Sequence, residues 1–275
     1  MAENGTESMQ ASTFNWNRVP VATWKIGQGR PLILIHGWGS DSSTLKPLAR
    51  SLSSIRTCHL LDLPGFGQSP EPDRPFSVDD YTDLVSDWID SMGEPPMDLL
   101  VHSYGGRIAL KLLSRTEGRD RFDKVLITGG AGLVPKRTGS YYRKRALAML
   151  LKTPLNILPP GLRQEATDRL RKTRIWKSLG SSDYNKLSGV MRETFVRSVT
   201  EPLDRTLPNI EQEVLLVWGK EDRATPLEQG QRMEKGIRNS VLVPIDGAGH
   251  YAFLDRPRQF SAIATAYYEP AGSAD

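Results

Sequence analysis

The sequence predicts an α/β protein built on a mostly parallel, doubly wound sheet of about eight strands. Short apolar runs alternate along the chain with segments of helical spacing, and strands that alternate with helices favour a parallel sheet. The run 32–35 reads Leu-Ile-Leu-Ile without a polar residue, as expected for a strand that is covered on both faces. A chain of 275 residues can bury a large core of this kind in a single domain.

The expected strands and helices follow one another along most of the chain. Strands are expected at 24–27, 31–35, 57–63, 97–101, 124–128, 213–218 and 241–245. Helices are expected at 44–52, 77–92, 104–114, 227–237 and 259–268, and Ser77 with Asp80 three residues later fits the start of the second. The polar segment 1–13 is expected to be a flexible leader, which leaves 14–132 and 201–275 for the core of the fold.

Residues 133–200, called the basic segment below, interrupt this alternation. They contain 15 Lys and Arg against 4 Asp and Glu, an excess of 11 positive charges in a chain whose net charge is +4. Helix-like stretches and a Pro-Pro-Gly break at 159–161 predict a helical lid inserted in the core. Its charge has two interpretations: solvated faces of lid helices, or a docking surface for an acidic carrier protein or an anionic surface. The docking interpretation involves Lys136, Arg137, Arg143, Lys144, Arg145, Arg169, Arg171, Lys172 and Arg174.

Composition narrows the class of protein. No apolar run reaches the length of about 18 residues that a transmembrane helix needs, and the first residues lack the pattern of a secretory signal. The single cysteine, Cys58, excludes an internal disulfide and indicates a reducing compartment. We therefore expect a cytoplasmic monomer or weak homo-oligomer. No nucleic-acid-binding motif is present, and we expect no metal site.

Three residues with catalytic potential follow three of the expected strands. Ser103 lies between a strand and a helix, Asp222 follows the strand 213–218, and His250 follows the strand 241–245. The carboxyl ends of parallel strands share one edge of the sheet, where α/β proteins bind ligands. Serine becomes a nucleophile when an adjacent base takes its proton. The pattern therefore predicts Ser103 as nucleophile, His250 as general base and acid, and Asp222 as the carboxylate that orients His250.

Each of these residues also has a structural interpretation, as a capping serine, a surface aspartate and a loop histidine. Their joint placement at three strand ends favours catalysis. Glu221 is an alternative to Asp222 as the orienting acid. The residue before the nucleophile, His102, is expected to point away from the site.

The loop that begins His36-Gly37-Trp38-Gly39 follows the strand 31–35. Small residues allow its backbone to turn toward a developing oxyanion, and His36 is expected to hold the loop. We predict the backbone N–H groups of Trp38 and Tyr104 as the oxyanion hole. The side chains of Trp38, Tyr104 and Tyr251 are predicted to line the substrate pocket, with ordinary packing as the alternative for Trp38 and Tyr251.

These motifs together resemble one family over residues 16–268. They are His36-Gly37-Trp38-Gly39, the segment 62–69 (Asp-Leu-Pro-Gly-Phe-Gly-Gln-Ser), Val101-His102-Ser103-Tyr104-Gly105, Trp218-Gly219-Lys220-Glu221-Asp222 and Gly249-His250. The chain resembles α/β-hydrolase-fold proteins, in the branch of small carboxylesterases, pimeloyl-carrier-protein methyl esterases and carbon–carbon bond hydrolases of ring-cleavage products. Val101 departs from the G-x-S-x-G pattern of that family, and we expect local repacking around an intact turn.

The resemblance implies a serine-dependent hydrolase that cleaves carboxylic esters through an acyl-enzyme without a metal or cofactor. The same three residues would also serve a carbon–carbon bond hydrolase, or an acyltransferase or perhydrolase. A non-enzymatic ligand receptor on a hydrolase scaffold is a further alternative.

Overall fold

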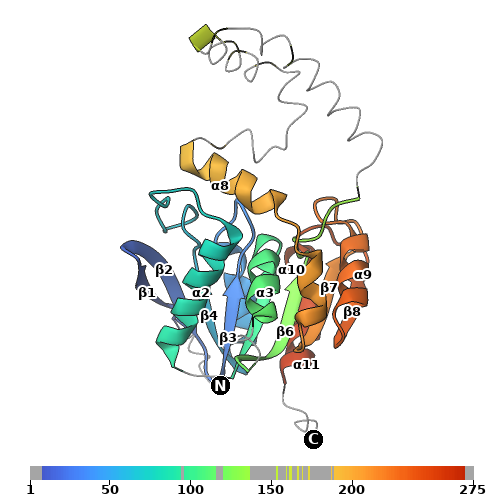
Figure 1. Cartoon of the computed structure of the whole chain (residues 1–275). Helices are drawn as coiled ribbons and strands as arrows, with labels where there is room; N and C mark the ends of the chain where they lie inside the picture. Colours follow the sequence, from blue (N-terminus) through green and yellow to red (C-terminus); the bar gives the residue numbers. More distant parts are fainter. Residues whose placement is uncertain are drawn as a thin grey trace, which may run out of the picture.

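A single eight-stranded sheet forms the centre of the protein (Figure 1). The computed structural model describes residues 8–93, 96–115, 120–136 and 189–269, together with isolated residues between 153 and 187. The strands are β1 (Gln10–Trp16), β2 (Val19–Ile26), β3 (Arg30–Ile35), β4 (Arg56–Leu61), β5 (Met97–His102), β6 (Phe122–Thr128), β7 (Glu213–Gly219) and β8 (Ser240–Ile245). Their spatial order is β1-β2-β4-β3-β5-β6-β7-β8, and only the pairs β1–β2 and β2–β4 are antiparallel. The predicted mostly parallel α/β fold is confirmed.

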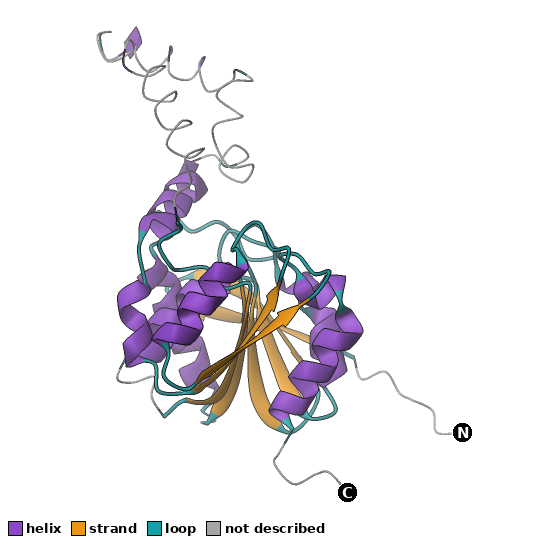
Figure 2. Ribbon diagram, turned by 90° about the vertical axis from the view of Figure 1, so that its right-hand side faces the viewer, coloured by secondary structure: helices purple, strands orange, loops and turns teal. Residues whose placement is uncertain are grey.

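Helices cover both faces of this sheet (Figure 2). They are α1 (Lys46–Leu52), α2 (Val78–Met92), α3 (Tyr104–Ser114), α9 (Leu227–Gly236), α10 (Ala252–Asp255) and α11 (Pro257–Tyr268), whereas α8 (Gly189–Thr200) lies beyond the carboxyl ends of the strands (Figure 1). Side chains of α2, α3 and α9 belong to one apolar cluster, and those of α1, α10 and α11 belong to another. In β3, Ile33 and Ile35 enter the first cluster while Leu32 and Leu34 enter the second. The continuous apolar run of this strand therefore reflects burial on both faces.

The expectation that residues 1–13 form a flexible leader is wrong for residues 10–13, because these residues begin strand β1. This strand pairs with β2 from Gln10 opposite Lys25 to Trp16 opposite Val19. The two-residue turn between them, Asn17 and Arg18, has φ values of 47° and 70°. Two successive positive φ angles are the geometry of the tight turn that matches the twist of a hairpin. Residues 10–13 of β1 are exposed, so their pairing with β2 holds them, whereas Phe14 and Trp16 at the end of the strand pack on the core. Residues 1–7 lie outside the described part of the chain.

Most of the basic segment lies outside the described residues, so the predicted lid and the two interpretations of its charge stay predictions. Of the residues of the docking interpretation, Lys136 and Arg169 are described, and Lys136 forms an ion pair with Glu228 at 2.8 Å. Among the described helices, none is long and apolar enough to cross a membrane.

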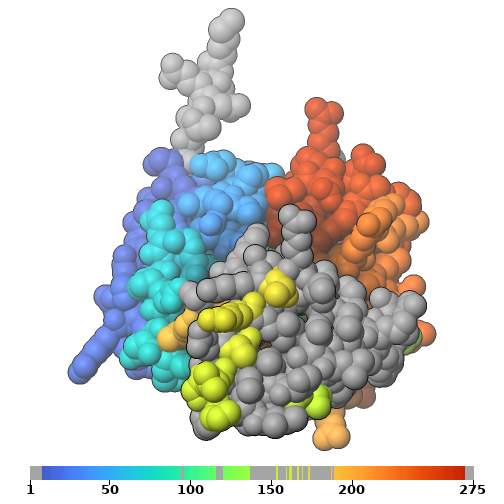
Figure 3. Space-filling model, turned by 90° about the horizontal axis from the view of Figure 1, so that it is seen from above, coloured from blue at the N-terminus to red at the C-terminus, as the bar shows by residue number. Residues whose placement is uncertain are grey.

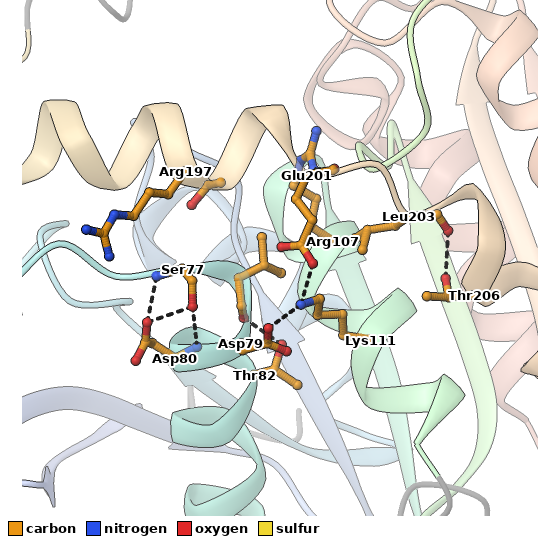
Figure 4. A network of polar contacts seen from close by, with 12 residues as sticks. Ser77, Asp79, Asp80, Thr82, Arg107, Lys111, Arg197, Glu201, Leu203 and Thr206 are labelled. Carbon is orange, nitrogen blue, oxygen red and sulfur yellow. Dashed lines mark hydrogen bonds and ion pairs between the residues drawn. The ribbon is translucent and has the colours of Figure 1, made fainter.

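Helix α8, the described end of the basic segment, is anchored on α3. The Arg107 guanidinium donates to the carbonyl oxygens of Glu201 and Val199, at 2.8 and 3.3 Å. The Lys111 ammonium lies 2.5 Å from carboxylate oxygens of both Asp79 and Glu201, so it joins α2, α3 and the chain that follows α8 (Figure 4). Because α3 begins directly after Ser103, these contacts place α8 beside the carboxyl edge of the sheet.

Candidate active site

Ser103 occupies a sharp turn between β5 and α3, with φ 51° and ψ −109°. A positive φ is unfavourable for a residue with a side chain and costs on the order of 1–3 kcal/mol. Three hydrogen bonds hold this conformation: the Ser103 N–H donates to Thr128 O at 3.1 Å, and Ser103 O accepts the N–H groups of Gly106 and Ala131 at 2.9 Å. The turn is therefore fixed by its neighbours, as expected for a nucleophile elbow.

The departure at Val101 leaves this turn intact. Val101 is fully buried and pairs within the sheet with Ile35 on one side and Ile127 on the other. The positions at which the backbone leaves no room for a side chain lie after Ser103, in the first turn of α3. A Cβ at Gly105 would lie 2.7 Å from the carbonyl oxygen of Ile35, and one at Gly106 would lie 2.9 Å from Gly130 Cα. The two glycines after the serine are thus the positions where α3 must pack without a side chain.

Ser103, Asp222 and His250 come together at the carboxyl edge. His250 Nε2 lies 2.9 Å from Ser103 Oγ, and His250 Nδ1 lies 2.8 Å from Asp222 Oδ2. A carboxylate oxygen accepts, so His250 Nδ1 carries the hydrogen and Nε2 is left to accept the serine proton. The geometry therefore gives His250 the tautomer that a general base requires.

The Asp222 side chain is fully buried and saturated with donors. Its Oδ1 accepts the N–H groups of Ala224 and Thr225 at 2.8 and 2.9 Å, and the Thr225 hydroxyl lies 2.9 Å from Oδ2. Burial alone raises the pKa of Asp222, but the hydrogen bond and charge of His250, with the Thr225 donors, outweigh it and keep the pKa below its ordinary value. Asp222 is therefore ionised under ordinary conditions. Glu221, the alternative acid, instead accepts the N–H of Gly247 at 3.2 Å.

Gly129, which directly follows β6, is a site residue that the sequence reasoning missed. Its φ is +54°, and a Cβ there would lie 3.2 Å from His250 Nδ1 and 3.3 Å from Asp222 Oδ2. A side chain at this position would crowd the contact between the base and its carboxylate. The available signal was a glycine at the end of a strand that neighbours the Ser103 strand.

The loop after β3 is held by the buried His36. His36 Nδ1 lies 2.8 Å from Gly37 O, and His36 Nε2 accepts the N–H of Leu63 at 3.0 Å. Because a peptide unit is planar and trans, fixing Gly37 O turns the Trp38 N–H to the opposite side. A Cβ at Gly37 would lie 2.9 Å from Ser103 Cβ, so the loop lies directly against the nucleophile. The predicted role of His36 in holding this loop agrees with these contacts.

Of the three aromatic residues predicted as pocket walls, Trp38 and Tyr104 lie at this loop and beside α8, whereas Tyr251 packs against His102 and Phe253. The Trp38 ring packs 5.2 Å from Tyr104 and 5.1 Å from Phe195 of α8. Tyr104 is 2% exposed, and its hydroxyl is 2.8 Å from Ser198 Oγ. Its backbone N–H is in the first turn of α3, where an α-helix offers no internal acceptor. Contact of these side chains, or of Tyr251, with substrate stays a prediction.

His102 contradicts the expectation that it points away from the site. Its Nε2 lies 3.0 Å from the carbonyl oxygen of His250, and the two imidazole rings are 4.8 Å apart. The His102 side chain is fully buried. It therefore contacts both the main chain and the ring of the proposed base.

Buried histidines make the fold sensitive to acid. Burial lowers the pKa of His36, lowers that of His59 to about 4 with help from the Lys25 charge, and lowers that of His102 to about 3 with help from His250. An unfolded histidine titrates near pH 6.5, so below that pH the unfolded chain binds protons that the folded chain refuses. We expect the free energy of unfolding to fall between pH 6.5 and 5, by on the order of 1 kcal/mol for each histidine and pH unit.

Urea unfolding at pH 7, 6 and 5 measures this loss. The variant His59→Gln removes one such histidine away from Ser103, so its stability should fall less steeply with acid than that of the wild type. A wild-type stability that is constant from pH 7 to 5 would contradict the prediction.

The two halves of the described chain each supply part of the site. Viewed from above, the N-terminal residues, coloured blue, and the C-terminal residues, coloured orange and red, occupy opposite sides of the molecule (Figure 3). Ser103 comes from β5 in the middle of the sheet, whereas Asp222 and His250 follow β7 and β8. The parallel pairing of β5, β6, β7 and β8 brings the three together.

Comparison with known proteins agrees with the fold and the motifs. The AB hydrolase superfamily protein YisY of Bacillus subtilis is 27% identical over 250 residues, which cover 86% of this chain and 91% of that protein. The pimeloyl-[acyl-carrier protein] methyl ester esterase of Nitrosospira multiformis is 26% identical over 255 residues, 86% of this chain and 94% of its own. The structure of an esterase from Exiguobacterium antarcticum aligns with a TM-score of 0.72 at 21% identity, over 95% of this chain and all of the other.

A match to one protein family extends over most of the chain and includes the segments that form the site. The model of the alpha/beta hydrolase family matches residues 32–263, from β3 to α11, and so includes the turn at Ser103 and both loops that carry Asp222 and His250. This chain belongs to the alpha/beta hydrolase family.

Proposed function

We propose that this protein hydrolyses carboxylic esters through an acyl-enzyme formed on Ser103. The observation that carries the proposal is the continuous hydrogen-bond chain from Ser103 Oγ through the His250 ring to Asp222, at 2.9 and 2.8 Å. These hydrogen bonds join a nucleophile, a base with the correct tautomer and a buried carboxylate that holds the base.

Acylation uses each of these groups in turn. Ser103 Oγ attacks the carbonyl carbon of the ester while His250 Nε2 takes the serine proton. The N–H groups of Trp38 and Tyr104 stabilise the negative charge on the carbonyl oxygen, at about 3 kcal/mol for each donor. His250 then gives its proton to the leaving alcohol oxygen as the bond to carbon breaks. The products of this half are the free alcohol and an ester on Ser103.

Deacylation repeats the sequence with water as nucleophile. His250 Nε2 takes a proton from water, which attacks the carbonyl carbon of the acyl-enzyme. The proton then returns to Ser103 Oγ as the acid leaves. Asp222 stays ionised throughout and stabilises the imidazolium form of His250 in each half.

A carboxylic ester is the substrate class that the relatives support best. The Nitrosospira multiformis relative is a methyl ester esterase by name, and the Exiguobacterium antarcticum structure is that of an esterase. The acyl-carrier protein in the first name, together with the charge of the basic segment, supports the proposal of an ester attached to an acidic carrier.

A panel of activated p-nitrophenyl esters of increasing acyl length tests the proposal. We expect steady release of nitrophenol, which Ser103→Ala abolishes, and covalent labelling of the wild type but not of this variant by a fluorophosphonate. Labelling that persists in Ser103→Ala would remove Ser103 as the nucleophile. A single burst without turnover would support a ligand receptor instead.

Two further arms of the same experiment separate the remaining alternatives. Turnover of a vinylogous diketone but of no ester would indicate carbon–carbon bond hydrolysis, and an ester product formed with an added alcohol would indicate acyl transfer. Hydrolysis of a carrier-linked ester that falls steeply with salt, while a short neutral ester is unaffected, is the result expected of docking at the basic segment.

A further inference from the structure

We propose that His102 is a positioning residue that fastens the main chain of His250 to the strand carrying Ser103. This inference rests on the proposed function, because it assigns His250 the role of base. The fastening keeps the base in line with the nucleophile during both halves of the reaction.

The position of His102 in the sheet determines what it can reach. It is the last residue of β5, and side chains alternate along a strand, so it extends the face that Leu100 presents to the α10–α11 side. The loop that carries His250 returns over this face. The His102 ring packs 4.8 Å from the His250 ring, 4.7 Å from Tyr251 and 5.1 Å from Phe253. His102 is thus enclosed by the segment that it contacts.

The direction of the hydrogen bond follows from its acceptor. The carbonyl oxygen of His250 can only accept, so His102 Nε2 carries the hydrogen across the 3.0 Å contact. His102 Nδ1 is then an acceptor, and it is buried with no hydrogen-bond partner among the described residues. A leucine would fill similar space without a buried unpaired nitrogen, so packing alone does not account for a histidine here.

A role for His102 as a second acid or base is excluded by its surroundings. Burial, followed by the nearby His250, lowers the pKa of His102 to about 3. The ring is therefore neutral near pH 7, with its one N–H hydrogen donated to the His250 carbonyl oxygen. What remains is the hydrogen bond to the main chain of His250.

The reaction itself explains why such a bond matters. Once Ser103 is acylated, its oxygen has no hydrogen to donate, and the 2.9 Å contact that joins it to His250 in the free enzyme is lost. Asp222 still holds the ring at Nδ1, and His102 still holds the backbone carbonyl. The bond from His102 ties His250 to the residue next to the acylated serine throughout deacylation. Small displacements of a catalytic group can cost about 100-fold in rate.

Three substitutions of His102 separate the effect of its hydrogen bond from the effect of its side-chain volume. His102→Leu removes the donor and keeps an apolar side chain. His102→Gln can place an amide N–H near the position of Nε2, whereas His102→Asn reaches only as far as Nδ1. The matched control is His59→Leu, which removes a histidine from β4 away from the site.

We expect His102→Leu and His102→Asn to lower kcat on p-nitrophenyl esters at least about 10-fold with KM within about threefold, and His102→Gln to recover most of the loss. The rate of fluorophosphonate labelling, which needs the base but no substrate pocket, should follow the same order. His59→Leu should retain wild-type rates. Thermal melting of each variant verifies that it is folded.

Two results would overturn the inference while leaving the proposed function standing. One is wild-type kcat in folded His102→Leu; the other is equal loss in all three variants, which would indicate packing. A wild type that neither turns over esters nor reacts with the fluorophosphonate would instead remove the proposed function.

Discussion

Replacing Asp222 with asparagine is expected to lower kcat about 10⁴-fold, although the substitution changes neither size nor fold. The reason lies in how the carboxylate is held. Asp222 Oδ1 accepts two backbone N–H groups, those of Ala224 and Thr225, and an asparagine can satisfy both only with its carbonyl oxygen. Its NH₂ group must then face His250 Nδ1, at the position where the carboxylate Oδ2 now accepts.

An NH₂ donor at that position reverses the tautomer of His250. The ring must accept at Nδ1 and carry its hydrogen on Nε2, where it faces Ser103 Oγ as a donor. In that state His250 cannot take the serine proton. Steady-state kinetics on an activated ester, with melting temperature as a check of the fold, measure the effect.

Glu221→Gln is the matched control, because it makes the same chemical change one residue earlier. Its carboxylate binds the N–H of Gly247, a contact that the glutamine oxygen can also make, so we expect a kcat within about twofold of wild type. A large loss in Glu221→Gln with activity retained in Asp222→Asn would show that the orienting acid had been assigned to the wrong residue.

The largest effect on stability is expected at the pair Arg56–Asp98, in the interior of the sheet. Arg56 Nε lies 2.7 Å from Asp98 Oδ2, and the two side chains are 6% and 0% exposed. Arg56 also donates to the carbonyl oxygens of Ile55 and Tyr268, so it joins β4 and β5 to the end of α11. Arg56→Leu would leave the Asp98 carboxylate buried without its cation. We expect the free energy of unfolding to fall by about 3–5 kcal/mol, measured by urea denaturation.

An exposed pair in the neighbouring strand provides the comparison. Arg30 is the register partner of Arg56 on β3, and it lies 2.6 Å from Asp123 with side chains 32% and 56% exposed. Water already solvates this pair, so Arg30→Leu should cost no more than about 1 kcal/mol. Adding Asp98→Asn to Arg56→Leu should restore part of the loss by removing the buried charge. Equal losses in the two single variants would contradict the account.

The sequence was sufficient to predict the central sheet and the three residues at its edge. The uninterrupted apolar run of a strand such as β3 predicts that it is buried on both faces. Parallel strands place their carboxyl ends at the same edge of the sheet, wherever the strands lie in the sequence. Ser103, Asp222 and His250 could therefore be brought together from strand ends alone. The predicted core boundary at 14 was too late, because β1 is held by backbone hydrogen bonds and its turn, Asn17-Arg18, lacks the glycine that usually marks a hairpin.

The role of His102 could not be predicted for a different reason. Alternation along β5 assigns its side chain to the face opposite Val101, but its partner lies 148 positions later in the chain. Only the path of the returning loop shows that His250 lies against this face. The anchoring of α8 is equally long-range, since the carbonyl oxygens that Arg107 contacts and the carboxylates that Lys111 contacts come from other elements.

The parallel pairing of β6 with β7 has a consequence for how activity relates to the state of the whole chain. The two strands are adjacent in space, with Thr128 beside Val217, although the basic segment separates them in sequence. Neither side of that interruption contains a complete set of reacting groups. Under the proposed function, turnover therefore requires both parts of the chain to be paired in the sheet, so that the rate reports the fraction of molecules in which β6 and β7 are assembled.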